Sequence, residues 1–363
     1  MSAHAGRDGF TAGGGRTASR APVIHDVARL AGVSHQTVSR VLNDHPNVRG
    51  TTRDRVLSAM RQLNYRPNAL ARGLASRRSR TVGVVGFDTR LFGPASALLA
   101  IEQAARAAGY AITLSSLAAE DAGSVRRSVE ALADQSVDGV IVIAPREDSA
   151  RGVSEFQGGL PIVAVEAGYA GGDVPVVSVD QFTGARLATD HLLELGHRTV
   201  WHVAGPADWL EAQERVEGWR ASLADAGVPA PPLIRGDWSP ASGYRAGLDL
   251  AARPGASAVF VANDEMALGL LHALSERGVR VPQDVSVVGF DSIPESEFFI
   301  PALTTVRQDF DELGRRGLEL LVDLMDDSPT HEEFRSRVTP SLMVRRSTAR
   351  YGGGDRAPRF SAA

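Results

Sequence analysis

The spacing of apolar residues changes near residue 80 and divides the chain into a helical part and a strand–helix part. Between residues 23 and 65, short apolar groups recur at the spacing of a helix face. These groups are Val27, Leu30 and Ala31, followed by Val38, Val41 and Leu42. The Arg66–Pro67 pair is expected to end the third helix, because a residue before proline disfavours the helical conformation. We therefore predict a small all-α domain over residues 23–67.

From residue 81 onward, continuous apolar runs alternate with helical stretches. The runs are TVGVVGF, AITLSS, DGVIVIA, PIVAVE, TVWHVAG, SAVFVAND and DVSVVGFD. Such runs are typical of strands that are covered on both faces. Their alternation with helices predicts an α/β domain with parallel, Rossmann-type sheets and right-handed crossovers. Ligands in such folds bind at the carboxyl ends of the strands.

Composition argues against a secreted, membrane-spanning or disulfide-containing protein. Residues 1–22 and 350–363 are rich in small and polar residues without periodicity, so we expect a disordered leader and a disordered tail. The leader lacks the apolar stretch of a secretory signal, and no apolar run is long enough to span a membrane. Cysteine is absent, which excludes disulfides and thiolate metal sites. A cytoplasmic protein with no membrane contact is expected.

The charge is distributed unevenly along the chain. Residues 1–80 contain 14 Arg and 4 Asp, a net charge of +10, and the remainder contains 25 Arg and 39 acidic residues, a net charge of −14. A basic segment attached to an acidic body predicts a module that binds a polyanion.

The segment from Ile24 to Asn43 has the features of a helix-turn-helix. Ala28 is small enough for two helices to meet closely, and Gly32 can adopt the positive φ of a tight turn. Ser34 is a good N-cap for the second helix, whose first turn enters the major groove of DNA in such motifs. That turn presents His35 and Gln36, with Arg40 one turn later. Side chains of these types form hydrogen bonds to base edges, so we predict that all three contact bases.

Other polar side chains of this region are better suited to phosphate, which fixes register but carries no sequence information. They are Thr37, Ser39, Asn43, Thr52 and Asn68. The alternative for the whole segment is a helical hairpin that binds nothing, and for His35 a role in capping or solvating its helix.

The pattern Asp26-Val-Ala-x-x-Ala-Gly-Val-Ser-x-x-Thr-Val-Ser-Arg-Val-Leu-Asn43, followed by Leu63-Asn-Tyr-x-Pro-Asn68, resembles the LacI/GalR family of bacterial repressors. The resemblance extends over most of residues 23–349. It implies that residues 68–79 form a hinge helix on DNA, with Ala71 where two hinges meet and Leu74 inserted in the minor groove. An apolar wedge of this kind kinks the duplex. It further implies a homodimer on a palindromic operator in double-stranded DNA.

The resemblance implies that residues 80–349 form a periplasmic-binding-protein-like domain of two lobes, with a small-molecule effector between them. Several of the residues that it places in this cleft follow predicted strands or carry groups suited to a sugar. The predicted ligand-binding residues are Leu91, Phe92, Pro94, Glu166, Glu211, Arg215, Trp238, Asn263, Asp291, Gln308 and Phe310. Leu91, Phe92 and Pro94 are expected in a loop. Glu166 and Glu211 depart from a well-studied family member, which has aspartate and serine there.

Each cleft residue also has a purely structural interpretation. Asp264, which follows the same predicted strand as Asn263, is suited to beginning a helix that Asn263 caps, and Asp291 is suited to capping a turn. Arg215 is suited to a surface ion pair, and Trp238 to packing within its lobe. The resemblance implies a sugar-released repressor, and a repressor activated by a purine corepressor is the alternative. A periplasmic sugar-binding protein would not have a helix-turn-helix. An enzyme is disfavoured because no phosphate loop, metal-spaced histidine cluster or nucleophile elbow occurs, and no cofactor is predicted.

Overall fold

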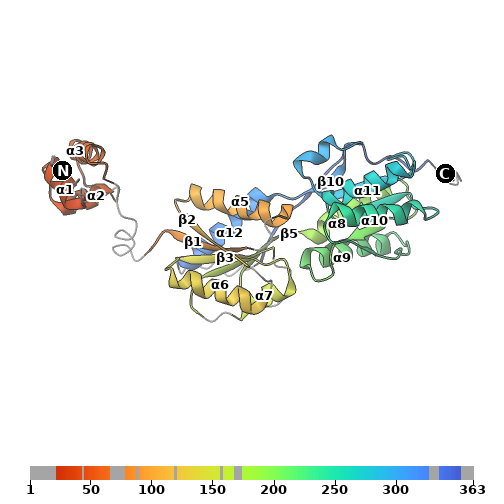
Figure 1. Ribbon diagram of the computed structural model, residues 1–363, viewed down its shortest axis with the longest axis horizontal. Coiled ribbons are helices and arrows are strands. Elements are labelled where there is room, and N and C mark those ends of the chain that lie inside the picture. Colours follow the sequence, from red (N-terminus) through yellow and green to blue (C-terminus); the bar gives the residue numbers. More distant parts are fainter. Residues whose placement is uncertain are drawn as a thin grey trace, which may run out of the picture. The chain divides into compact units, whose positions relative to one another are not determined.

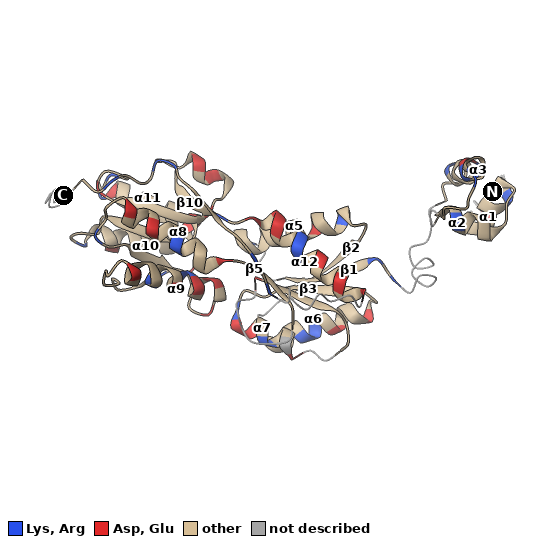
Figure 2. Ribbon diagram, turned by 180° about the vertical axis from the view of Figure 1, so that it is seen from behind, with Lys and Arg blue, Asp and Glu red and all other residues tan. Residues whose placement is uncertain are grey.

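The computed structural model describes residues 22–42, 45–65, 78–86, 90–117, 121–155, 158–166, 174–326 and 335–352. The chain divides into two compact units, Met1–Arg77 and Arg78–Ala363. The fold class that the sequence predicts is confirmed: a helical N-terminal unit is followed by a two-lobed α/β unit (Figure 1, and from behind in Figure 2).

Short helices build the first unit around a small apolar core. They are α1 (Ile24–Ala31), α2 (His35–Leu42) and α3 (Gly50–Gln62). Val27, Val38 and Val56 are fully buried between them. Gly32 ends α1 with a φ of 63°, and the Ser34 hydroxyl accepts a hydrogen bond from the Thr37 amide at 3.1 Å, so the predicted turn and N-cap are confirmed.

Two details of the helical unit differ from the prediction. Leu30 lies in the predicted apolar stripe but is 49% exposed, because Val27 and Ala31 already fill the narrow face of the short helix α1. Helix α3 ends at Gln62, before the Arg66–Pro67 pair. Asn64 adopts a positive φ, and the Tyr65 amide donates to the Met60 carbonyl, so the turn itself ends the helix.

The first lobe of the second unit is a parallel sheet with the strand order β11-β5-β4-β3-β1-β2. Its strands are β1 (Thr81–Gly86), β2 (Ala111–Ser116), β3 (Gly139–Ile143), β4 (Ile162–Val165), β5 (Val176–Val179) and β11 (Arg335–Val338). Helices α5 (Phe92–Ala107) and α12 (Phe310–Met325) cover one face, and α6 (Ala122–Asp134) and α7 (Glu147–Ser154) cover the other (Figure 1).

The second lobe repeats this arrangement with the order β12-β10-β9-β8-β6-β7. Its strands are β6 (Trp201–Ala204), β7 (Ile234–Arg235), β8 (Ala258–Val261), β9 (Ser286–Asp291), β10 (Thr304–Arg307) and β12 (Ser341–Met343). Helices α8 (Gln181–Glu194) and α9 (Leu210–Asp225) pack on one face, and α10 (Pro240–Ala251) and α11 (Asp264–Glu276) on the other. A short 3-10 helix, η1 (Pro294–Phe298), follows β9.

The chain passes between the lobes three times: after β5, after β10 and after β11. The sequence runs identified β1 to β4, β6, β8 and β9. Strand β7 was not recognised because it has only two residues, and β5, β10 and β11 were not recognised because polar residues interrupt their sequences, VVSV, TTVR and RSRV. Strand β12 pairs antiparallel with β10, so the second sheet is not wholly parallel. The reason is the last crossover, a short connection that returns the chain to the sheet edge without a helix.

Candidate functional site

The first turn of helix α2 presents polar side chains to solvent. His35, Gln36 and Arg40 are all exposed, as base-reading residues of a helix-turn-helix must be. The ring of His25, the second residue of α1, packs edge-on against the ring of His35 with centroids 5.2 Å apart. His25 was not among the residues that the sequence pattern singled out.

The predicted phosphate contacts differ in their surroundings. Thr37, Ser39 and Thr52 are half-buried, and the Thr37 hydroxyl lies 2.9 Å from the Ser34 hydroxyl. Asn43, Asn68, Ala71 and Leu74 lie outside the described residues, as does most of the predicted hinge helix. Their proposed contacts therefore stay predictions.

In the second lobe, Arg215 of helix α9 is the centre of a buried polar network. Its side chain is 2% exposed and donates through Nε to Gln181 Oε1 at 2.8 Å and through Nη1 to the carbonyl of Ala262. Its Nη2 atom lies 3.4 Å from Glu211 Oε2 and 3.8 Å from Asp291 Oδ1. Every nitrogen of the guanidinium therefore has an acceptor within the protein.

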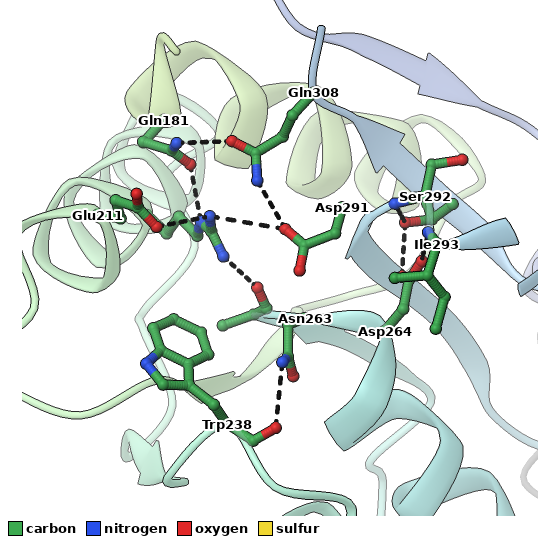
Figure 3. A network of polar contacts seen from close by, with 12 residues as sticks. Gln181, Glu211, Trp238, Asn263, Asp264, Asp291, Ser292, Ile293 and Gln308 are labelled. Carbon is green, nitrogen blue, oxygen red and sulfur yellow. Dashed lines mark hydrogen bonds and ion pairs between the residues drawn. The ribbon is translucent and has the colours of Figure 1, made fainter. Parts of the chain in front are cut away.

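Asp291 and Gln308 extend this network to the crossover between the lobes. Gln308 Nε2 donates to Asp291 Oδ1 at 2.7 Å, and Gln308 Oε1 accepts from Gln181 Nε2 at 2.8 Å (Figure 3). Asp291 ends strand β9, and Gln308 follows strand β10, so both lie at carboxyl ends of parallel strands. The network thus joins the predicted ligand position of the sheet to one of the connections that links the lobes.

Trp238 and Asn263 stand beside Arg215. The indole of Trp238 is 6% exposed, lies 5.5 Å from the Arg215 guanidinium carbon and packs so closely on Gly205 that a Cβ atom there would approach it to 2.2 Å. Its Nε1 has no hydrogen-bond partner among the described residues. Asn263 caps helix α11 by accepting from the Met266 amide, and its Nδ2 donates to the Trp238 carbonyl at 3.1 Å.

The predicted cleft residues of the first lobe are apolar, except for Glu166. The rings of Phe92 and Phe310 meet edge-on with centroids 5.9 Å apart, and Leu91 packs against the apolar cluster that contains Trp238. Phe92 and Pro94 lie in the first turn of α5, not in a loop, because a proline is tolerated where a helix needs no amide donor. Glu166, which follows β4, is 3% exposed, and its Oε1 has no partner among the described residues.

Comparison with known proteins places these sites in one family. Residues 23–68 match the model of bacterial regulatory proteins of the lacI family, and residues 189–348 match a periplasmic binding protein-like domain. The HTH-type transcriptional repressor PurR of Mannheimia succiniciproducens is 34% identical over 330 residues, which cover 89% of this chain and 98% of that protein. The chain belongs to the LacI family. It is a DNA-binding transcriptional repressor of that family.

Solved structures of LacI-family proteins have the same architecture. The lac repressor dimer bound to operator and the anti-inducer ONPF superposes with a TM-score of 0.80 at 32% identity, covering 91% of this chain and all of that chain. The transcriptional regulator CelR in complex with cellobiose superposes with a TM-score of 0.66 at 34% identity, covering 90% and 99%. In the described part of this LacI-family chain, no helix is long and apolar enough to cross a membrane.

Two further polar residues of the second lobe support the network, and sequence reasoning missed the first of them. Gln181, which bridges Arg215 and Gln308, begins α8 directly after β5, so recognising that short strand would have marked it as a strand-end residue. Asp264 is fully buried and accepts hydrogen bonds from the Thr305 hydroxyl at 2.6 Å and the Ile293 amide at 2.9 Å. Asp264 therefore fixes the loop that follows β9.

The acidic groups of the site are perturbed by burial. Burial raises the pKa of Glu211 to about 7, against the opposing effect of the Arg215 charge. Burial also raises the pKa of Asp264 to about 7 and that of Asp291 well above its usual range. A single guanidinium thus faces more carboxyl groups than it can neutralise, and these groups retain protons at a pH where exposed carboxyls have lost them.

The Glu211→Gln variant is expected to flatten the pH dependence of folding stability. Between about pH 4.5 and pH 7, folded Glu211 holds a proton that the unfolded chain has released, so stability falls as pH rises. One such group contributes a slope of about 1.4 kcal/mol per pH unit. Urea unfolding at pH 5, 6, 7 and 8 measures the slope. Glu217→Gln, an exposed position on the same helix, should retain the parent slope; equal slopes in both variants would contradict the prediction.

Proposed function

We propose that this LacI-family repressor binds a palindromic operator as a homodimer and is released from it by a sugar held between the lobes of its second unit. His35, Gln36 and Arg40 read bases in the major groove, and Thr37, Ser39, Asn43, Thr52 and Asn68 contact phosphates. Ala71 and Leu74 of the hinge bind the minor groove. A homodimer fits a two-fold operator, and the related lac repressor structure is a dimer on its operator.

The network around Arg215 is the observation that supports a sugar most directly. A ring of hydroxyls needs donors and acceptors side by side, and Arg215, Asp291, Gln308 and Asn263 provide both at the carboxyl ends of the strands. Trp238 provides an aromatic surface next to them, with a buried Nε1 donor that lacks a protein partner among the described residues.

Other residues complete the proposed effector site. Leu91, Phe92, Pro94 and Phe310 supply apolar contacts from the first lobe, and Glu166 supplies a buried acceptor. Glu211 places a carboxyl group beside Arg215. The cellobiose complex of CelR, which is 34% identical to this chain, supports a sugar as ligand.

A purine corepressor is the second candidate, and the relatives named PurR favour it. In that case the ligand strengthens operator binding instead of weakening it. Trp238 would stack on the purine, while the Asp291 carboxyl and the Gln308 amide would meet its ring nitrogens and exocyclic groups.

A ligand screen followed by DNA-binding measurements separates the two candidates. An operator is first selected from random duplex DNA with the full chain. Thermal denaturation is then recorded with cellobiose, lactose, hypoxanthine and guanine, since a ligand at 100 times its Kd stabilises the native state by about 2.7 kcal/mol. We expect a sugar to raise Tm and to weaken operator binding at least tenfold. A purine that raises Tm and strengthens operator binding would replace this proposal by the second candidate, and failure to select any operator would refute both.

A further inference from the structure

The two lobes make a direct contact away from the three chain crossovers. We call it the clasp: residues 145–147 of the first lobe and residues 208–213 of the second. The Leu210 amide donates to the Pro145 carbonyl at 2.9 Å, and Arg146 and Trp209 form an isolated antiparallel bridge. The Leu210 side chain packs into the apolar cluster of the first lobe. The clasp therefore consists of contacts that can separate without breaking the chain connection.

Side chains of the clasp bring Arg146 onto Trp209. The guanidinium carbon of Arg146 lies 5.4 Å from the centroid of the Trp209 ring, and its Nη1 is 3.1 Å from Asp208 Oδ2. A second contact joins Gln213 Nε2 to Glu147 Oε1 at 2.8 Å. Cation–π and ion-pair contacts at a partly exposed site are modest individually, so this contact is suited to reversible opening.

Trp209 connects the clasp to the candidate effector site. Its side chain is 3% exposed, and its ring meets the Trp238 ring edge-on, with centroids 5.4 Å apart and an interplanar angle of 72°. Trp238 in turn lies against Arg215, whose guanidinium carbon is 5.5 Å from the indole centroid. A continuous series of ring and cation contacts thus runs from Arg146 of one lobe to the polar network of the other.

We propose that Arg146 is a positioning residue for the effector site. From the first lobe it holds the Trp209 ring in place, and through Trp209 it fixes the position of the Trp238 indole in the second lobe. The assignment to the effector site rests on the proposed function, whereas the positioning itself does not. A lobe movement that withdraws Arg146 removes its contact with the Trp209 ring. Conversely, a ligand that displaces Trp238 shifts the Trp209 ring and so disturbs the contacts of the clasp. Effector contact and lobe arrangement are thereby linked through packed side chains.

The test compares Arg146→Ala, at the N-cap of helix α7, with Arg151→Ala, an exposed arginine within α7 that forms an ion pair with Asp148 of the same helix. The chain contains no cysteine, so Ala131→Cys and Ala224→Cys, one exposed position in each lobe, accept spin labels without further changes. We expect the label-to-label distance distribution to shift and broaden in Arg146→Ala and to stay unchanged in Arg151→Ala. Arg146→Lys, which keeps the cation, should restore part of the parent distribution.

Tryptophan fluorescence provides a second readout in the full chain. Acrylamide quenching should increase at least twofold in Arg146→Ala, and most of this increase should vanish when Trp209→Phe is added, because the freed Trp209 ring is then absent. Trp201 and Trp219, which lie outside the clasp and the effector site, serve as an internal reference. Asp208→Asn should produce a smaller change in the same direction. Equal distances and equal quenching in Arg146→Ala and Arg151→Ala, with both variants folded by urea titration, would overturn the proposal.

A binding measurement links the clasp to the effector. Whichever of cellobiose, lactose, hypoxanthine or guanine binds the parent should bind Arg146→Ala at least fivefold more weakly and Arg151→Ala equally well. Normal affinity despite a shifted distance would overturn the assignment of Arg146 to the effector site. If none of the four compounds binds, the effector proposal loses its support. The spin-label and quenching results still decide whether Arg146 positions Trp209 and Trp238.

Discussion

Replacing Arg215 by alanine is expected to lower the free energy of unfolding by about 3–5 kcal/mol and to remove the response to the effector. The guanidinium is 2% exposed and is the cation that Glu211 and Asp291 share. Its loss leaves these carboxyls buried without a counter-charge and leaves Gln181 without a hydrogen bond. Urea unfolding at pH 8 measures the loss, and operator binding with and without the effector measures the response.

Two further variants make this prediction specific. Arg220→Ala removes an exposed arginine from the same helix and should change stability by less than about 0.5 kcal/mol. Adding Asp291→Asn to Arg215→Ala removes one of the stranded carboxyls, so part of the lost stability should return. A loss below 1 kcal/mol in Arg215→Ala, or no recovery in the double variant, would show that the buried charges are not coupled in this way.

Replacing Arg40 by alanine is expected to weaken operator binding by about 1–3 kcal/mol, or roughly 5- to 150-fold, and to relax the preference at one base pair of each half-site. Arg40 is exposed on α2, whose first turn also presents His35 and Gln36. The variant would lose the bidentate contact to guanine that we propose for Arg40, and we expect the fold of the unit to be preserved. Competition binding against all single-base variants of the selected operator measures the change.

An arginine outside the base-reading turn provides the matched control. Arg61→Ala, at the exposed end of α3, changes the charge of the unit by the same amount but removes no base contact. We expect any loss of affinity in this control to be uniform across operator sequences and accompanied by a smaller salt dependence. A uniform loss in Arg40→Ala as well would assign Arg40 to phosphate instead of a base.

The helix-turn-helix was predictable because local rules determine it. Gly32 is needed where φ is positive, Ser34 where a helix begins, and apolar residues where short helices meet. Leu30 shows the limit of this reasoning: helical spacing places a residue on one side of a helix, but a core of three short helices is too small to bury the whole stripe. Which member of a stripe remains exposed depends on neighbours that lie far away in the sequence.

The chemistry of the second unit was predictable in kind but not in arrangement. The sequence pointed to Arg215, Asp291 and Gln308, and the structure brings them together. The sequence did not point to Gln181 as well, because Ser178 interrupts the apolar run of β5 and this strand was not recognised. The closure of the clasp by Arg146 and Trp209 also escaped notice, since contacts between lobes leave no periodic pattern in the chain.

The chain crossovers have a consequence for how such a repressor can change during evolution. The boundary between the two units lies at a single point in the chain, between Arg77 and Arg78. One recombination event at this point can therefore join the second unit to a different DNA-binding unit. The lobes are different: strand β11 of the first lobe and strand β12 of the second are supplied by the last part of the chain. Exchanging one lobe between relatives would require three simultaneous junctions. New effector specificity is therefore more accessible through point substitutions in the cleft than through transfer of a lobe.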